Sequence, residues 1–66
     1  MAKIIDLDEI SENQYVDKKV VALYLSLSVR TVETMTSKRQ IPAYKIGSSV
    51  RYRLGEIREW VTLKQL

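Results

Sequence analysis

Hydrophobic residues recur with helical spacing shortly after position 17. Val21, Ala22 and Leu25 fall on one face of a helix, because Leu25 follows the other two by four and three residues. Two lysines precede them on another side of the helix. Asp17 stands just before this segment, where its carboxylate can accept a hydrogen bond from an unpaired backbone N–H of the first turn. The pattern predicts a short helix that begins after Asp17.

A second helix is expected after the tripeptide Ser26-Leu27-Ser28. Ser28 is a favourable N-cap, and the helix should run from Val29 to about Arg39 with Val32 and Met35 facing inward. Two short helices joined by a turn of this length form a helix-turn-helix pattern.

A β-hairpin is expected after Pro42, which ends the helical region because it has no amide proton. Two segments that alternate apolar with basic or small residues flank the linker Gly47-Ser48-Ser49, and this predicts a hairpin. Tyr44 and Tyr52 are expected in the core. The cations that alternate with the apolar residues project from the opposite sides and are expected to be exposed. They are Lys45, Arg51 and Arg53.

Helical spacing returns from Gly55 to about Lys64. Ile57, Trp60 and Val61 form an apolar stripe that ends in the stem of Lys64, and Trp60 is expected to anchor the core. The order helix, turn, helix, hairpin, helix predicts a small α+β domain with three short helices and a two-stranded hairpin.

Charge separates the two ends of the chain. Residues 1–14 carry Lys3 against four acids, a net charge of −3, so residues 15–66 carry ten basic and four acidic side chains, a net charge of +6. We interpret residues 1–14 as an acidic leader and residues 15–66 as the folded domain. Three interpretations of the leader stay open: a flexible segment, packing on the core, or packing on a second copy.

The side-chain inventory argues against an enzyme. The chain has no histidine and no cysteine, which removes the usual general base and the usual metal and disulfide ligands. Two glycines cannot form a glycine-rich phosphate loop. No apolar run approaches the length of a membrane span. We expect no catalytic residue, metal, cofactor, small-molecule ligand or membrane partner.

Positive charge is concentrated in the middle of the chain. Between Ser28 and Arg53 there are six basic residues and one acid, Glu33. Such a region favours contact with a polyanion such as nucleic acid, although a solvated basic surface would have the same composition.

The second helix carries side chains suited to reading the major groove of DNA. Arg30 can pair with guanine or phosphate, Glu33 can accept from cytosine, and Thr34 can contact a thymine methyl group. The helix N-terminus at Ser28 can hold a phosphate. Each of these residues taken alone could equally be a solvated helix residue. Ser37 is also expected to face outward, and the candidate helix contacts are Ser28, Arg30, Thr31, Glu33, Thr34 and Lys38.

The hairpin can supply cations to the flanking phosphates or to a minor groove. Arg51 is the strongest single candidate, and the hypothesis expects Arg30 and Arg51 on the same side of the molecule. The candidate hairpin contacts are Lys45, Ser48, Ser49, Arg51 and Arg53.

Several short motifs follow one another in a fixed order between Tyr15 and Trp60. They are Ala22 and Leu25, the segments 27–32, 41–47 and 51–53, and finally Glu56, Ile57 and Trp60. In this order they resemble the excisionase-type branch of the MerR-like winged helix-turn-helix superfamily. The resemblance implies that the second helix enters the major groove of duplex DNA and that the hairpin, as a wing, reaches the adjacent backbone or minor groove.

The resemblance also implies partners and a cellular setting. Members of this branch act as accessory factors that bend DNA for a tyrosine recombinase (integrase), or as small transcription regulators of phages and mobile elements. Duplex DNA, an integrase and cooperative self-association on DNA are the implied partners, in the bacterial cytoplasm at the nucleoid. A different class of function, a protein-interaction or anti-repressor module that does not touch DNA, would leave the basic hairpin dispensable.

The chain departs from the family pattern at several positions. Ser26 stands where the turn usually has a glycine, so the turn needs a strained residue or a longer path, and a second family glycine is missing near Gln40. Glu33 and Thr34 replace an aromatic residue or an arginine, so the family's sequence preference does not transfer.

Overall fold

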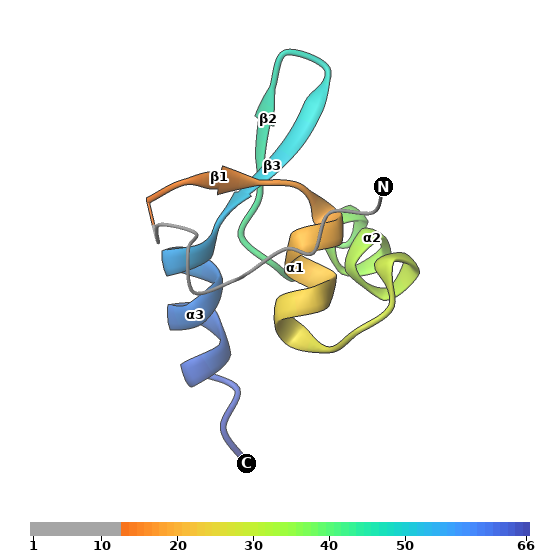
Figure 1. Ribbon diagram of the computed structural model, residues 1–66. Helices are drawn as coiled ribbons and strands as arrows, with labels where there is room; N and C mark the ends of the chain where they lie inside the picture. The colour runs from red at the N-terminus through yellow and green to blue at the C-terminus, as the bar shows by residue number, and fades with distance from the viewer. Residues whose placement is uncertain (1–12) are drawn as a thin grey trace, which may run out of the picture.

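The computed structural model describes residues 13–66. Its elements in chain order are β1 (Tyr15–Val16), α1 (Lys18–Leu25), α2 (Val29–Ser37), β2 (Tyr44–Ile46), β3 (Ser49–Arg53) and α3 (Leu54–Thr62). Three helices and an antiparallel sheet confirm the α+β winged helix-turn-helix fold, with the β2–β3 hairpin projecting beyond the helices (Figure 1). Residues 1–12 lie outside the described residues, so the leader and its boundary stay predictions.

The sheet has one strand more than the expected hairpin. Its order is β1-β3-β2, with Tyr15 opposite Arg53 and Val16 opposite Tyr52. The turn is also shorter than expected, because Ser49 already pairs with Ile46 and leaves only two residues between the strands. Gly47 has φ 64° and is the first of these two, the position that a type II′ turn reserves for glycine.

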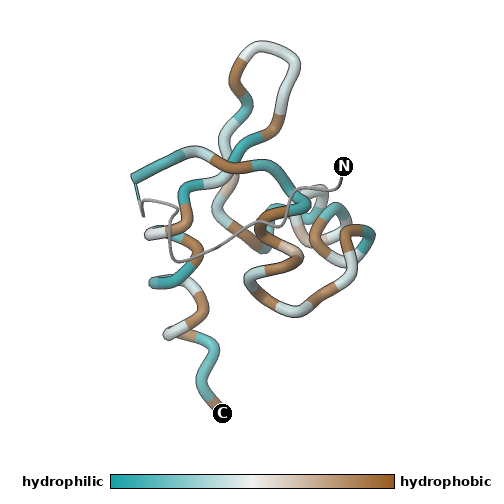
Figure 2. Tube along the Cα trace, viewed as in Figure 1, coloured by the Kyte–Doolittle hydropathy of each residue, from teal (hydrophilic) through white to brown (hydrophobic). Residues whose placement is uncertain are grey.

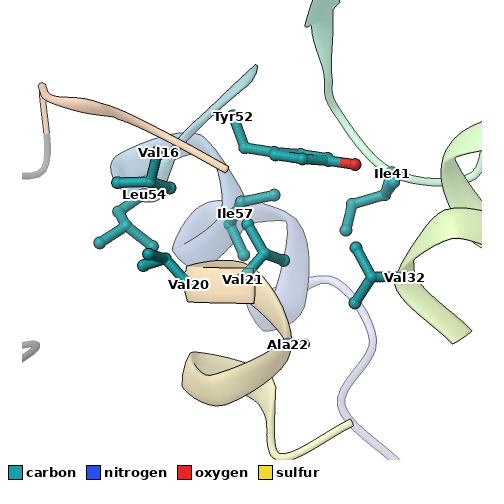
Figure 3. Packing of buried hydrophobic residues seen from close by; sticks show 9 residues of the cluster. All are labelled: Val16, Val20, Val21, Ala22, Val32, Ile41, Tyr52, Leu54 and Ile57. Carbon is teal, nitrogen blue, oxygen red and sulfur yellow. The ribbon is translucent and has the colours of Figure 1, made fainter. Parts of the chain in front are cut away.

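The core lies on the face of the sheet that carries Tyr52 (Figure 3). Tyr52, Val21, Val32 and Ile57 are almost completely buried. Leu25, Met35 and Trp60 pack against the same cluster from its margin. The cluster therefore joins the sheet to all three helices, and its buried members are Val16, Val20, Val21, Ala22, Val32, Ile41, Tyr52, Leu54 and Ile57.

The C-terminal helix agrees with its prediction in part. Trp60 packs on the core as expected, and the ammonium of Lys64 lies 5.3 Å from the centre of its ring, a cation–π arrangement. Val61 is 39% exposed, so the apolar stripe is narrower than the spacing predicts. The helix begins at Leu54 rather than Gly55 and ends at Thr62, two residues before Lys64.

The first two helices end in the same backbone motif. Ser26 and Arg39 follow α1 and α2 in the left-handed conformation, with φ 56° and 57°. After them, the N–H of Leu27 bonds to the carbonyl of Ala22 and the N–H of Gln40 bonds to that of Met35, as in Schellman motifs. Glycine is the residue that usually takes this position. The turn therefore uses a strained residue rather than a longer path, and α2 stops at Ser37 instead of near Arg39.

Candidate nucleic-acid interface

Two side-chain caps fix the starts of the first two helices. The carboxylate of Asp17 accepts from the N–H groups of Lys19 and Val20 at 3.0 and 3.1 Å, which confirms the predicted cap of α1. Ser28 caps α2 by accepting from the N–H of Thr31 at 3.1 Å. The hydroxyls of Ser28 and Thr31 also bond to each other at 2.8 Å. Both candidate contacts at this end of α2 are therefore part of the helix cap.

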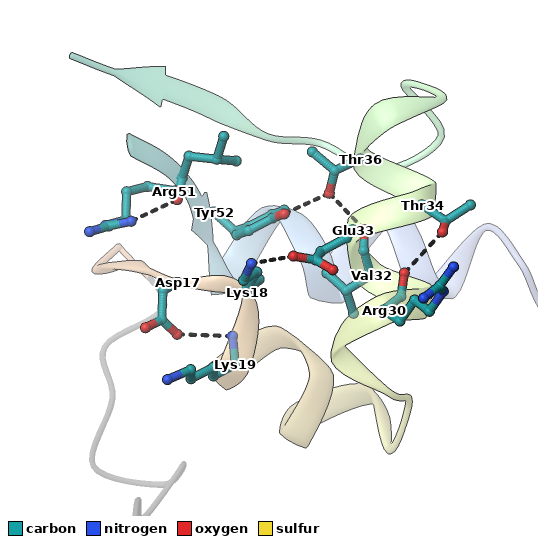
Figure 4. A network of polar contacts seen from close by, with 11 residues as sticks. Asp17, Lys18, Lys19, Arg30, Val32, Glu33, Thr34, Thr36, Arg51 and Tyr52 are labelled. Atoms are coloured by element: carbon teal, nitrogen blue, oxygen red, sulfur yellow. Dashed lines mark hydrogen bonds and ion pairs between the residues drawn. The ribbon is translucent and has the colours of Figure 1, made fainter. Parts of the chain in front are cut away.

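The exposed side of α2 is a polar strip with a shallow depression. Along it, the Thr34 hydroxyl donates to the backbone carbonyl of Arg30 at 3.0 Å, which occupies its proton within the helix (Figure 4). Arg30 and Lys38 have no side-chain hydrogen bond or ion pair within residues 13–66. Their charges are available to an anionic partner. The residues around the depression are Arg30, Glu33, Thr34, Ser37 and Lys38.

Glu33 has a partner that the sequence did not reveal. The ammonium of Lys18, in the first turn of α1, forms an ion pair with the Oε2 atom of Glu33 (Figure 4). The hydrogen bond and the charge of Glu33 raise the pKa of Lys18 above its usual value. The helical spacing of α1 placed Lys18 away from the core but could not show which residue of α2 it meets. Lys18 thus belongs to the same surface as the predicted helix contacts.

The hairpin has two faces that the pairing register separates. Lys45 is opposite Val50, so both side chains lie on the face that carries Tyr52. Tyr44 is opposite Arg51, and these two lie on the other face. Hydrophobic and hydrophilic residues alternate along both strands (Figure 2), but the register brings hydrophobic residues of one strand opposite hydrophilic residues of the other, so each face carries both kinds.

A hydrogen bond shows which of these faces looks toward α2. The hydroxyl of Thr36 lies 2.6 Å from that of Tyr52 and donates to the carbonyl of Val32, so Tyr52 is the donor of the shared bond. Lys45 therefore projects from the face that looks toward α2. Arg51 projects from the opposite face, and Figure 4 shows it extending away from α2 and from Arg30. The expectation that Arg30 and Arg51 lie on one side is wrong, because the register gives adjacent cations of the hairpin opposite directions.

The other hairpin candidates differ in how strongly the fold engages them. Arg51 donates to the carbonyl of Val50 in its own strand at 2.8 Å. Arg53 is half-buried and donates to Glu56 at 3.1 Å and to Asn13 at 3.0 Å. Arg53 is thus not a free cation, contrary to the expectation of an exposed charge. Ser48 lies at the turn, and Ser49 begins β3.

Tyr44 is not a core residue, contrary to the prediction. It is 37% exposed and packs edge-to-face on Tyr15, with ring centres 5.5 Å apart. Its hydroxyl donates to Glu56, and this hydrogen bond is the main cause that raises its pKa above the ordinary value. The two-residue turn explains the difference, because it pairs Tyr44 with Arg51 rather than with Tyr52 and so places Tyr44 on the outer face, where β1 supplies Tyr15 as its partner.

The described residues bring together no cluster of side chains that could bind a metal ion. In residues 13–66 no helix combines the length and apolar character that crossing a bilayer requires. The predicted contacts lie on the polar strip of α2 and on the hairpin.

Comparison with known families gives the class of the protein. The chain matches the family described as helix-turn-helix domain over residues 15–62. The chain belongs to this family. The helix-turn-helix protein thus binds double-stranded DNA, and its family is generally non-enzymatic. No curated protein and no solved structure is significantly similar to it.

Proposed function

We propose that this helix-turn-helix protein is an excisionase-type accessory factor, which binds a specific duplex site and shapes the DNA for a site-specific recombinase. The proposal rests on the resemblance of its motifs to that branch. One structural observation supports a grip at two points: the polar strip of α2 and the Lys45 side of the hairpin lie on the same side of the sheet.

In this proposal α2 enters the major groove and the hairpin reaches the neighbouring backbone. Arg30 and Lys38 need break no ion pair to meet DNA, which favours them as contacts. The duplex on this side meets Lys45 directly. Arg51 meets DNA when the tip of the hairpin enters a groove, whose walls touch both faces. The full proposed surface is Ser28, Arg30, Thr31, Glu33, Thr34, Lys38, Lys45, Ser48, Ser49, Arg51 and Arg53.

The size of the domain bears on its partners. A single module of this kind buries about 600–1,000 Å² on DNA, which limits the affinity of one copy. Tandem sites, self-association on DNA or contact with a tyrosine recombinase would supply the remaining affinity. A single short footprint with tight binding would contradict this part of the proposal.

Selection of bound DNA from a random pool, followed by gel shifts of permuted fragments, tests binding and bending together. We expect a defined site and a mobility that varies with the position of the site in the fragment. The double variant Arg30→Ala, Lys45→Ala should bind at least about tenfold more weakly, because two phosphate or base contacts are lost. The control Lys19→Ala, Lys64→Ala removes the same charge elsewhere. Equal binding by both variants would refute this surface, whereas a wild-type chain that retains no DNA would favour the interaction-module alternative.

Excision distinguishes the accessory factor from a small transcription regulator, which would use the same surface. An adjacent gene for a tyrosine recombinase would favour excision, and the test then adds the protein to that recombinase with DNA carrying the two attachment sites. Accumulation of the excised circle supports the proposal. Tight binding at a promoter with no effect on excision would favour the regulator.

A further inference from the structure

Helix α2 carries one acid, Glu33, and a residue of another helix forms an ion pair with it. Glu33 is the only acidic residue between Ser28 and Arg53. It lies on the exposed strip of α2, one turn from Arg30 and beside the depression on this surface. An isolated carboxylate there would be repelled by the phosphates of an approaching duplex. Its position therefore calls for a compensating charge.

Lys18 supplies that charge and leaves part of the carboxylate unused. Its ammonium bonds to the Oε2 atom of Glu33, and the two side chains are 45% and 48% exposed. No hydrogen bond or ion pair reaches the Oε1 atom from residues 13–66. Ion pairs this exposed contribute little to folding stability, so the fold alone gives little reason for the contact.

We propose that Lys18 and Glu33 act as one base-reading unit, in which Lys18 is the positioning residue. Lys18 holds Oε2 and compensates its charge, and Oε1 accepts a hydrogen bond from a base in the major groove. This inference rests on the proposed docking of α2 in that groove.

The chemistry of the bases selects the partner of Oε1. Cytosine and adenine are the bases that present an amino group in the major groove. Adenine places the acceptor N7 beside its amino group, and a carboxylate cannot donate to it, whereas cytosine presents the amino group without an adjacent acceptor. The unit should therefore favour cytosine at the base pair it contacts.

Random-pool selection with four variants tests this inference. The wild-type chain should enrich cytosine about tenfold at one position of the site. Glu33→Gln should shift that position toward adenine, because an amide offers both a donor and an acceptor. Lys18→Ala should reduce the cytosine preference there to about threefold, since the carboxylate loses its anchor, and Lys18→Arg should restore it. Lys19→Ala removes the same charge from the same helix without touching Glu33, and should leave all preferences unchanged.

The outcomes separate this inference from the proposed docking. If Glu33→Gln and Lys18→Ala keep the wild-type base frequencies at every position, the reading unit is wrong while the docking of α2 stands. If only Glu33→Gln changes them, Lys18 has no part in reading. If the folded wild-type chain enriches no sequence, both the docking and the unit are wrong. Circular dichroism checks that each variant is folded. Lys18 and Glu33 are both exposed, so substitutions there should not disrupt the fold.

Discussion

The two faces of the small sheet carry similar residues but differ in what surrounds them. On the inner face Tyr52 is 1% exposed, contacts the core and bonds to Thr36 of α2. On the outer face Tyr44 is 37% exposed and bonds to Glu56 near the start of α3. The cations divide in the same way, with Lys45 on the inner face and Arg51 on the outer face.

This difference separates the residues that stabilise the fold from the proposed DNA contacts in a domain with few buried residues. The inner face holds the helices together near the base of the hairpin, and farther out it presents Lys45 on the side of α2. The contacts of the outer face are an aromatic pair, hydrogen bonds to Glu56, and a hydrogen bond from Arg53 to Asn13. Substitutions on the two faces should therefore have different effects.

The largest expected effect is on the free energy of unfolding, when the two tyrosines are replaced in turn. Tyr52→Ala should cost about 3–5 kcal/mol of unfolding free energy, because it leaves a cavity in the core. Tyr44→Ala should cost about 1 kcal/mol, since it removes an exposed aromatic contact and one hydrogen bond. Urea denaturation measures both. A core of this size supplies only about 3–5 kcal/mol in total, so Tyr52→Ala can unfold the protein completely. Tyr52→Phe, with an expected loss of about 1 kcal/mol, keeps the ring and measures the bond to Thr36 in a folded protein. An unfolding free energy of Tyr52→Phe equal to that of the wild type would contradict the role of the bond to Thr36.

The second effect compares the two cations in DNA binding. Lys45→Ala should weaken binding about threefold to tenfold, with little dependence on sequence, and should lower the salt slope by about 1. Arg51→Ala should have the same effect if the hairpin tip enters a groove, and almost none if only the inner face meets the duplex. Salt titrations of both variants on the selected site decide between these two modes. Loss of binding in Arg51→Ala alone would show that the outer face of the hairpin, rather than the inner face, meets the duplex.

The third test asks whether stability comes from burial alone, using a residue that belongs to neither face. Ser26→Gly should stabilise the fold by about 0.5–1 kcal/mol, because glycine adopts the left-handed conformation without the strain of a side chain. Ser37→Gly, the same change in the last turn of α2, should destabilise it by about 0.5–1 kcal/mol. Thermal denaturation of both proteins gives the two signs. A loss of stability in Ser26→Gly would show that the serine side chain outweighs the backbone strain.

The smallest effect is a pH dependence on the outer face. The hydrogen bond to Glu56 raises the pKa of Tyr44 above its ordinary value near 10. The folded chain thus keeps a proton that the unfolded chain loses, so this contribution is complete below pH 10 and disappears as the pH rises through the folded pKa. The Tyr44→Phe variant lacks this contribution, so the difference in unfolding free energy between the wild type and the variant should become smaller above pH 10. A gap that stays constant up to pH 11 would contradict the hydrogen bond.

Local patterns in the sequence predicted the helices and their caps, because Asp17, Ser28 and the apolar spacing act within one or two turns. The pairing of β1 was not predictable, since two residues show no periodicity and their partners are far away in the chain. The same reason applies to the site. Helical spacing identified the exposed side of α2, whereas the Lys18–Glu33 pair and the direction of Arg51 depend on how separate elements pack.

The bond between Tyr52 and Thr36 also has a geometric consequence. Successive grooves of a duplex are separated by a fixed pitch, so a module that touches two of them must hold its helix and its hairpin at a matching interval. Tyr52 lies in β3, which continues into the hairpin, and its hydroxyl bonds to α2. In the proposed docking this core residue would therefore set the distance between α2 and the hairpin, and a change at Tyr52 would displace the two proposed contacts relative to each other without altering either one.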